Sequence, residues 1–333
     1  MTHIAVMGSG SWGTAFSLVL ADAGNDVTLW GRRAELAEAI NTKHKNVDYL
    51  PDIELPHNIV ATTDPAEALN NAEVVVFAVP SQTLRENLKQ WGDLVPTDSI
   101  LVSLMKGIEL GSKKRMSQVL CEETGADPER VAIISGPNLA KEIANREPAA
   151  SVIAAVDEAT ATKLQGLSHT KAFRPYTNTD VIGCELAGAT KNIIALAVGV
   201  CDGLGFGDNT KASVITRGLA ETTRLGMAMG ADLRTFSGLA GMGDLVATCS
   251  SPLSRNRTFG EKMGRGQSVS QIVAATRQVA EGVKSVLPIT ELASEYGVEM
   301  PIADAVNALI EEKMNPKEMV TALISRSAKP ESL

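Results

Sequence analysis

The chain has 333 residues, 44% of them hydrophobic and 21% charged, and its formal net charge at pH 7 is −8. This length exceeds what one hydrophobic core usually supports, so we expect a soluble protein of two domains. The negative charge argues against general binding of nucleic acid or anionic membranes, because the long-range field repels both, and an anionic substrate would need a local cluster of donors.

Short apolar runs alternate with amphipathic stretches along the first half of the chain. The runs are continuous, which is typical of strands covered on both faces. They predict strands at residues 3–7, 26–30, 73–79, 99–104, 131–134 and 149–154, with helices at 14–23, 82–91 and 113–124 between them. Strands that alternate with helices predict a parallel, doubly wound α/β sheet of the Rossmann type in residues 1–179.

The composition changes near residue 180. Residues 181–200 are rich in Ala, Gly, Ile, Leu and Val and contain few helix breakers. Helical patterns follow at residues 212–229, 269–276, 288–296, 302–312 and 316–324. The sequence therefore predicts an all-α second domain in residues 180–333.

The first predicted strand ends in Gly8-Ser9-Gly10-Ser11-Trp12-Gly13, which fits the G-x-G-x-x-G pattern. The pattern alone is weak, but here it follows a strand, opens a helix and is followed by a second strand, a context that favours dinucleotide binding. The three glycines let the backbone approach a pyrophosphate, which the free N–H groups at the helix start would bind. The alternative for Trp12 is packing in the core.

The second predicted strand is followed by Gly31-Arg32-Arg33. NAD-specific folds usually have Asp or Glu there, about 20 residues after the loop, to bind the ribose 2′-OH. Here no carboxylate repels a 2′-phosphate, and two guanidinium groups can bind it. We therefore expect NADPH to be accepted well. The alternative is that both arginines are only a solvated helix start.

Lys191 lies in an apolar helical stretch, where its same-face neighbours are Ala187, Gly188, Ile194 and Ala195. Burying a lysine among such neighbours is costly unless the amine has a partner or a task, and burial lowers the pKa of an amine. That suits a group that gives a proton to a carbonyl oxygen while hydride reaches the carbon. The alternative is a lysine whose ammonium group reaches solvent.

Other polar groups stand where ligands commonly bind. Lys106 follows the fourth predicted strand and Ser135-Gly136-Pro137-Asn138 the fifth, and ligands of open α/β sheets lie at the carboxyl ends of the strands. In Ser254-Arg255-Asn256-Arg257 a serine is placed to cap a helix whose start suits a phosphate monoester. Asp244 could orient Lys191. From the residues alone, Asp244 and the 254–257 motif could equally lie in surface loops.

Ten stretches of the chain match one family in order, at residues 8–15, 50–52, 78–81, 106–107, 134–137, 188–192, 202–207, 216–218, 241–245 and 254–257. This set resembles the bacterial NAD(P)-dependent glycerol-3-phosphate dehydrogenases over nearly the whole chain. The resemblance implies reversible reduction of dihydroxyacetone phosphate to sn-glycerol 3-phosphate for glycerophospholipid biosynthesis. It also implies NADPH or NADH as cofactor, no metal, and a cytoplasmic homodimer.

The resemblance also implies roles for individual residues. Lys191 would be the catalytic proton donor and acceptor. The other substrate contacts would be Lys106, Gly136, Asn138, Asp244, Ser254, Arg255 and Asn256. The cofactor contacts would be Ser11, Trp12, Arg32, Arg33, Tyr49, Lys106, Ala140, Arg255, Val279 and Glu281, beside the glycine loop of Gly8, Gly10 and Gly13. Asn138 departs from the family pattern, where Ser or Thr is expected, although its amide can still form a hydrogen bond.

Three other functions are weighed against this one. Another reductase of the same architecture, such as a hydroxyacid or ketopantoate reductase, would have no use for the 254–256 phosphate motif. A non-catalytic NADP(H)-sensing protein would not need a nearly buried amine at position 191. A nucleotide-sugar dehydrogenase would need a nucleophilic cysteine, and Cys249 lies in no recognisable context for that role.

The cysteines and the N-terminus indicate a cytoplasmic protein. Residues 1–6 contain neither a basic segment nor a long apolar run, so they do not resemble a signal peptide, and no stretch is expected to span a membrane. The cysteines form no C-x-x-C pair or zinc-like spacing, so we expect reduced thiols at Cys121, Cys184, Cys201 and Cys249.

Overall fold

The computed structural model describes residues 1–275 and 280–325. Its backbone contacts divide the chain into two compact units. The first unit comprises Met1–Met105 and Met116–Val181, and the second comprises Lys106–Arg115 and the described residues from Ile182 onward. We call Lys106–Arg115 the inserted segment, because it belongs to the second unit although both of its chain neighbours belong to the first. The predicted boundary between residues 179 and 180 instead assigns these residues to the first domain.

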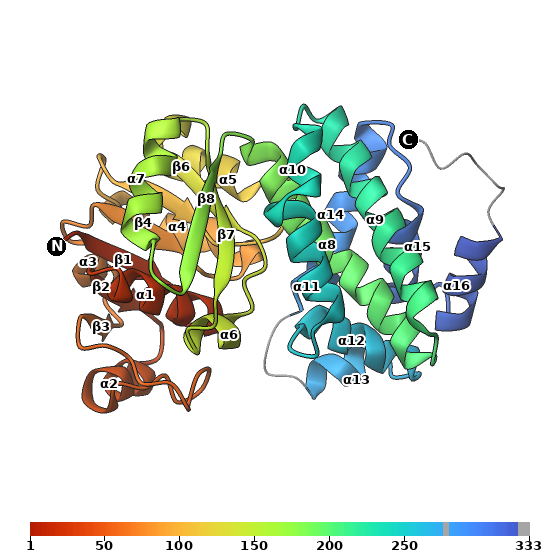
Figure 1. Ribbon diagram of the computed structural model, residues 1–333, viewed down its shortest axis with the longest axis horizontal. Coiled ribbons are helices and arrows are strands. Elements are labelled where there is room, and N and C mark those ends of the chain that lie inside the picture. The colour runs from red at the N-terminus through yellow and green to blue at the C-terminus, as the bar shows by residue number, and fades with distance from the viewer. Residues whose placement is uncertain (276–279, 326–333) are drawn as a thin grey trace. The chain divides into compact units, whose positions relative to one another are not determined.

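The first unit is built on one eight-stranded sheet in the order β3-β2-β1-β4-β5-β6-β7-β8 (Figure 1). The strands are β1 (His3–Met7), β2 (Asp26–Trp30), β3 (Ile59–Thr62), β4 (Val74–Phe77), β5 (Ile100–Ser103), β6 (Val131–Ser135), β7 (Ala149–Ala155) and β8 (Phe173–Asn178). Neighbouring strands are parallel except β6 and β7, which are antiparallel. The predicted doubly wound α/β fold is confirmed, but the expectation of a wholly parallel sheet is wrong at this one pair.

The sequence analysis missed β3 and β8, which are the two edge strands of the sheet. An edge strand is covered less completely than a central one, so its apolar run is interrupted. In β8 the buried Phe173 and Pro175 alternate with the exposed Arg174 and Tyr176. A proline usually argues against a strand, but an edge strand tolerates it because one row of its N–H groups has no neighbour to bond.

Both faces of the sheet are buried, which explains the continuous apolar runs. Along β1, Ile4 and Val6 face one hydrophobic cluster, while Ala5 and Met7 face another. The helices that cover the sheet are α1 (Ser11–Asp22), α2 (Ala34–Lys43), α3 (Pro65–Leu69), α4 (Leu84–Trp91), α5 (Met116–Thr124), α6 (Ala140–Ala144) and α7 (Glu158–Ser168). Helix α5 begins three residues later than predicted, because the residues before it belong to the inserted segment.

Apart from the inserted segment, the described part of the second unit is helical, as predicted. Its helices are α8 (Val181–Gly203), α9 (Asp208–Ala228), α10 (Leu233–Ser237), α11 (Asp244–Ser250), α12 (Arg255–Gly264), α13 (Val269–Ala274), α14 (Glu281–Glu295), α15 (Pro301–Ile310) and α16 (Pro316–Ile324), with a π-helical turn at Leu239–Gly243. Helix α14 begins seven residues before the predicted start at Pro288. Proline favours a first helical turn, but here it lies inside the helix.

Helix α8 forms the centre of the second unit. It is 23 residues long and contains an 18-residue window of mean hydropathy 1.5. By length and composition alone it could cross a membrane, a property that the sequence analysis overlooked. The window is 94% buried inside the structure, which is typical of a core helix in a soluble protein. The same burial explains why the same-face neighbours of Lys191 along its own helix, such as Ala187 and Ile194, are apolar.

Helices α8 and α12 cross at glycines, so their backbones lie close together. A Cβ atom added at Gly199 would lie 2.0 Å from the carbonyl oxygen of Arg257, and one at Gly260 would lie 2.1 Å from that of Leu196. Both distances are shorter than real Cβ contacts, so only glycine fits at this crossing. The contact fixes the start of α12, which carries the predicted phosphate motif, relative to α8, which carries Lys191.

Candidate active site

In the first unit, the glycine loop has the geometry of a nucleotide-binding turn. Gly8 has φ 139°, and a Cβ atom there would lie 2.5 Å from the carbonyl oxygen of Ala78. At Gly13 a Cβ atom would lie 1.9 Å from the carbonyl oxygen of Gly8, so only glycine lets α1 begin so close to β1. A Cβ atom at Gly10 would meet nothing within 4 Å, which leaves open space beside the N-terminal end of α1. These features fit the pyrophosphate of a dinucleotide cofactor.

A buried asparagine that the sequence analysis missed supports this loop. The side-chain amide of Asn46 donates to the carbonyl oxygen of Ser9 at 3.0 Å and to the hydroxyl of Thr14 at 2.8 Å. Asn46 is completely buried. No motif marks it, because it lies beyond the end of α2, 33 residues after the glycine at the end of the loop pattern, and meets the loop only in the folded chain.

The two arginines after β2 differ in their surroundings. Arg33 pairs with Asp48 at 2.6 Å, and its guanidinium lies over the ring of Tyr49, 5.6 Å from the centroid. Arg32 is exposed, and the structure gives its guanidinium no ion pair or side-chain hydrogen bond with the described residues. Arg32 therefore presents the more accessible charge for a 2′-phosphate, while Arg33 also braces Tyr49.

Trp12 is half-buried and packs against the hydrophobic cluster on one face of the sheet, with its ring 5.6 Å from Phe16. The ring of Trp12 thus packs in the core, as the alternative interpretation expected. Its indole N–H is buried and has no acceptor among the described residues.

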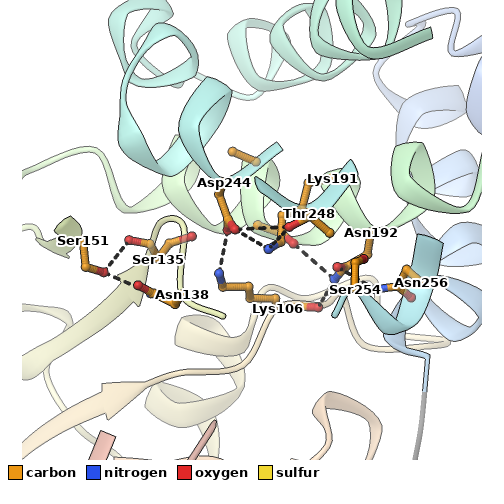
Figure 2. A network of polar contacts seen from close by, with 12 residues as sticks. Lys106, Ser135, Asn138, Ser151, Lys191, Asn192, Asp244, Thr248, Ser254 and Asn256 are labelled. Carbon is orange, nitrogen blue, oxygen red and sulfur yellow. Dashed lines mark hydrogen bonds and ion pairs between the residues drawn. The ribbon is translucent and has the colours of Figure 1, made fainter. Parts of the chain in front are cut away.

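In the second unit, Lys191 lies in a buried polar cluster. Its Nζ donates to Asp244 Oδ1 and, at 2.8 Å, to the hydroxyl of Thr248. Asp244 begins α11 and is 1% exposed, and Thr248 lies one helical turn further on. Lys106 Nζ donates to the second oxygen of the same carboxylate, Asp244 Oδ2, at 2.5 Å (Figure 2). We call Lys106, Lys191, Asp244 and Thr248 the lysine–aspartate cluster.

Burial lowers the pKa of Lys191 to about 7, although the Asp244 carboxylate favours the charged amine. The positive charge of Lys106 lowers this pKa further. Two ammonium groups thus share one buried carboxylate, which cannot neutralise both. The arrangement gives Lys191 a proton that it can release or accept near neutral pH, as general acid–base catalysis requires. It also contradicts the alternative of a lysine that reaches solvent, because the residue is only 8% exposed.

Two asparagines connect the cluster with the start of α12 (Figure 2). Asn192 Nδ2 lies 3.4 Å from the carbonyl oxygen of Lys106, and Asn192 Oδ1 accepts from Asn256 Nδ2 at 2.8 Å. Asn256 Oδ1 in turn accepts from the backbone N–H of Gly282 at 3.0 Å. Asn256 thus braces Asn192 and α14 through both ends of its amide.

The predicted helix cap at Ser254 is confirmed, since its hydroxyl accepts from the backbone N–H of Arg257 at 3.3 Å. Arg255 is exposed at the first position of α12, while the guanidinium of Arg257 pairs with Asp202 at 2.6 Å. Of the two arginines in the motif, only Arg255 is thus exposed at the helix start, where the backbone N–H groups favour an anion.

The other predicted contacts are distributed between the units. In the first unit, Gly136 has φ 136°, and Asn138 Nδ2 donates to the hydroxyl of Ser151 at 3.0 Å, which donates to the carbonyl oxygen of Ser135 at 2.9 Å. Asn138 Oδ1 is buried without a donor among the described residues. Ala140 begins α6 and Glu281 begins α14 of the second unit. Val279 lies outside the described residues.

The cysteines do not support a thiol-based reaction. Cys249 is 2% exposed, and burial raises the pKa of its thiol to about 12, which disfavours the nucleophilic thiolate that a nucleotide-sugar dehydrogenase would need. All four cysteines are free thiols in the structure. Within residues 1–275 and 280–325 there is no group of three or more His, Cys, Asp or Glu side chains that could hold a metal ion.

Comparison with known proteins identifies the family. Residues 3–161 match the model of the NAD-dependent glycerol-3-phosphate dehydrogenase N-terminus, and residues 180–321 match that of its C-terminus. The chain belongs to the NAD(P)-dependent glycerol-3-phosphate dehydrogenase family. The resemblance inferred from the sequence motifs is thereby confirmed.

Relatives match the chain over nearly its full length. A glycerol-3-phosphate dehydrogenase [NAD(P)+] of Streptomyces griseus is 61% identical, over 99% of both chains. The corresponding protein of Thermobifida fusca is 60% identical, again over 99% of both chains. Among solved structures, the glycerol-3-phosphate dehydrogenase of Coxiella burnetii is 36% identical with a TM-score of 0.93, over 98% of this chain and 99% of that one.

Proposed function

We propose that the protein catalyses the reversible, NAD(P)H-dependent reduction of dihydroxyacetone phosphate to sn-glycerol 3-phosphate, which supplies glycerophospholipid biosynthesis. The observation that carries the proposal is the lysine–aspartate cluster, in a chain of this dehydrogenase family. Reduction of a ketone adds a hydride to the carbonyl carbon and a proton to the oxygen. NADPH or NADH, when bound, supplies the hydride.

In this proposal Lys191 supplies the proton. Its ammonium group gives a proton to the carbonyl oxygen during reduction, and its neutral amine takes the proton from the hydroxyl during oxidation. Asp244 and Thr248 hold the amine in place, since both bond directly to Nζ. Lys106 adds the positive charge that an anionic substrate requires in a protein whose net charge is −8.

The remaining roles follow the family. Ser254, Arg255 and Asn256 would hold the substrate phosphate at the start of α12, with Gly136 and Asn138 as further substrate contacts. The supporting observations are the exposed Arg255 and the capped helix start. We assign cofactor binding to Gly8, Gly10, Ser11, Trp12, Gly13, Arg32, Arg33, Tyr49, Lys106, Ala140, Arg255, Val279 and Glu281.

The alternatives receive less support. A reductase of an unphosphorylated keto acid would leave the charged start of α12 without a purpose. A non-catalytic NADP(H) sensor would have to maintain a buried amine of pKa about 7 without using its proton. We also propose that the enzyme is a cytoplasmic homodimer, as in the family it resembles, and sedimentation analysis of the purified protein tests that oligomeric state.

A steady-state assay with dihydroxyacetone phosphate and each nicotinamide tests the function. The decisive variant is Lys191→Met, which keeps an apolar stem but removes the ammonium group. We expect kcat to fall by about 100-fold or more, the usual lower cost of losing general acid catalysis. NADPH affinity, measured by fluorescence titration, should stay near that of the wild type. Turnover within about tenfold of the wild type would leave Lys191 a positioning charge at most.

A further inference from the structure

Lys106 joins the lysine–aspartate cluster on a short piece of chain that needs support of its own. The inserted segment leaves the first unit after β5 and returns to it before α5, yet it packs with the second unit. A long, flexible lysine side chain loses conformational freedom when it is held at one carboxylate oxygen. Its backbone must therefore be fixed relative to α8, which carries Lys191, and to α11, which carries Asp244.

The inserted segment is closed on itself. Ile108 and Arg115 pair as an isolated antiparallel bridge, two residues beyond Lys106. Between them, the backbone N–H of Glu109 donates to the carbonyl oxygen of Lys114 at 3.0 Å, and that of Lys113 donates to Glu109 at 3.0 Å. Arg115 is thus fixed opposite Ile108, which follows Lys106 by two residues.

Several contacts attach this segment to the helical unit, among them the ion pair of Lys113 with Glu295 on α14, and two of them are deeply buried. Ile108 is completely buried in the hydrophobic core of that unit. The guanidinium of Arg115 pairs with the Glu185 carboxylate on α8 at 2.6 Å, with side chains that are only 13% and 4% exposed. An Arg–carboxylate pair fixes direction as well as distance, because the guanidinium is planar and rigid. Glu185 precedes Lys191 by six residues on the same helix.

We propose that Arg115 and Glu185 are positioning residues that hold Lys106 against Asp244. Glu185 fixes Arg115, Arg115 fixes Ile108 across the bridge, and the backbone of Lys106 follows. The positions of both ammonium groups on Asp244 then depend on one helix, because Lys191 lies on α8 and Lys106 is held through Glu185 of α8. The inference depends on the proposed function only for the effect on catalysis, because the contacts that position Lys106 involve no ligand.

Displacement of Lys106 has a predictable electrostatic result. The charge of Lys106 lowers the pKa of Lys191, and Asp244 raises it. If Lys106 withdraws, Lys191 loses a repulsive neighbour and no longer shares the carboxylate. The pKa of Lys191 then rises. A purely structural ion pair would lower the stability of the protein without moving this pKa in the folded enzyme.

The test is the Arg115→Gln variant of the full-length enzyme, measured well below its melting temperature. We expect kcat/KM for dihydroxyacetone phosphate to fall by up to about 100-fold, the effect of misplacing a reacting group by about 1 Å. The Kd for NADPH should stay unchanged. An NMR titration of the lysine amines should show Lys191 titrating at higher pH than in the wild type.

Arg85→Gln is the control, because it removes an arginine of the first unit that pairs with the carboxylates of Glu122, at 2.8 Å, and of Glu123. It should change the melting temperature only, while Arg115→Lys should give an intermediate effect on kcat/KM. If Arg115→Gln does not fold, Arg115→Lys decides the question in the same way. Wild-type kcat/KM and an unshifted Lys191 titration in the folded variant would overturn the positioning role.

The NMR titration also separates this inference from the proposed function. It needs no substrate, so an upward shift in Arg115→Gln supports the positioning role even if the wild type reduces no dihydroxyacetone phosphate. An inactive wild type would sink the proposed function alone.

Discussion

At Asp244 one buried carboxylate serves two ammonium groups, and this imbalance adds to burial, the larger effect, in lowering the pKa of Lys191. A single buried ion pair would keep its lysine protonated at neutral pH. Here burial and the second cation outweigh the carboxylate and bring the pKa of Lys191 to about 7. The same amine can therefore act as an acid in one direction of the reaction and as a base in the other.

We predict opposite pH profiles for the two directions of the reaction. Reduction requires the ammonium form of Lys191, so its kcat/KM should be highest below about pH 7 and fall as the pH rises through that value. Oxidation of glycerol 3-phosphate requires the neutral amine, so its kcat/KM should rise over the same range. Initial rates at a series of pH values check this. The same trend in both directions would exclude Lys191 as the titrating group.

Cofactor choice depends on Arg32 and Arg33, which should bind the 2′-phosphate. Replacing both with alanine should raise the KM for NADPH far more than the KM for NADH, because only NADPH carries that phosphate. Of the single variants, Arg32→Ala should have the larger effect, since Arg33 also pairs with Asp48. Equal changes for both cofactors would rule out this role for the two arginines.

At this scale the sequence was informative where a residue conflicts with its neighbours. Lys191 could be predicted because a lysine within an apolar helical stretch needs an explanation. Thr248 carried a weaker signal, namely its spacing of one helical turn from Asp244. Asn46 carried none, because its contacts with Ser9 and Thr14 exist only in the folded chain.

At the scale of elements, the glycine crossing of α8 and α12 brings two parts of the site together. We predict that Gly260→Ala destabilises the protein by about 1–3 kcal/mol, the usual cost of overpacking a core, because its Cβ would lie 2.1 Å from a backbone oxygen that cannot turn away. The KM for dihydroxyacetone phosphate should also rise, since the start of α12 would shift. Chemical denaturation and steady-state kinetics measure the two effects.

Gly166→Ala in α7 is the matched control. A Cβ atom there would meet nothing within 4 Å, so alanine should be neutral or stabilise the helix by about 0.5–1 kcal/mol. If Gly260→Ala unfolded at the same denaturant concentration as Gly166→Ala, the two helices could not approach as closely as the structure indicates.

Most elements followed from their patterns, and the misses have physical reasons. Central strands were predictable because both of their faces are buried. The edge strands β3 and β8 were not, because partial exposure interrupts their apolar runs. Pro288 misled the assignment of α14, because the preference of proline for a first turn is local, whereas tertiary packing allows it inside a helix.

On the scale of the whole molecule, the two-part organisation was visible in the change from alternating strands and helices to helices alone. The assignment of the inserted segment to the second unit could not be predicted from the sequence. Nothing in residues 106–115 shows locally that they pack against helices much later in the chain, such as α8, where Glu185 lies 70 residues after Arg115. The burial of Ile108 and the pairing of Arg115 with Glu185 reveal it, and both are long-range contacts.

The inserted segment affects how the two halves of such an enzyme can be recombined. A chimera joined at residues 179 and 180 would bring a foreign first half together with that protein's own version of the segment. The core of the helical half would then contain a side chain from the other protein in place of Ile108, and Glu185 would face that protein's residue in place of Arg115. Cofactor preference can therefore be transplanted between relatives only if residues 106–115 stay with the helices they fit, which requires three junctions in the gene instead of one.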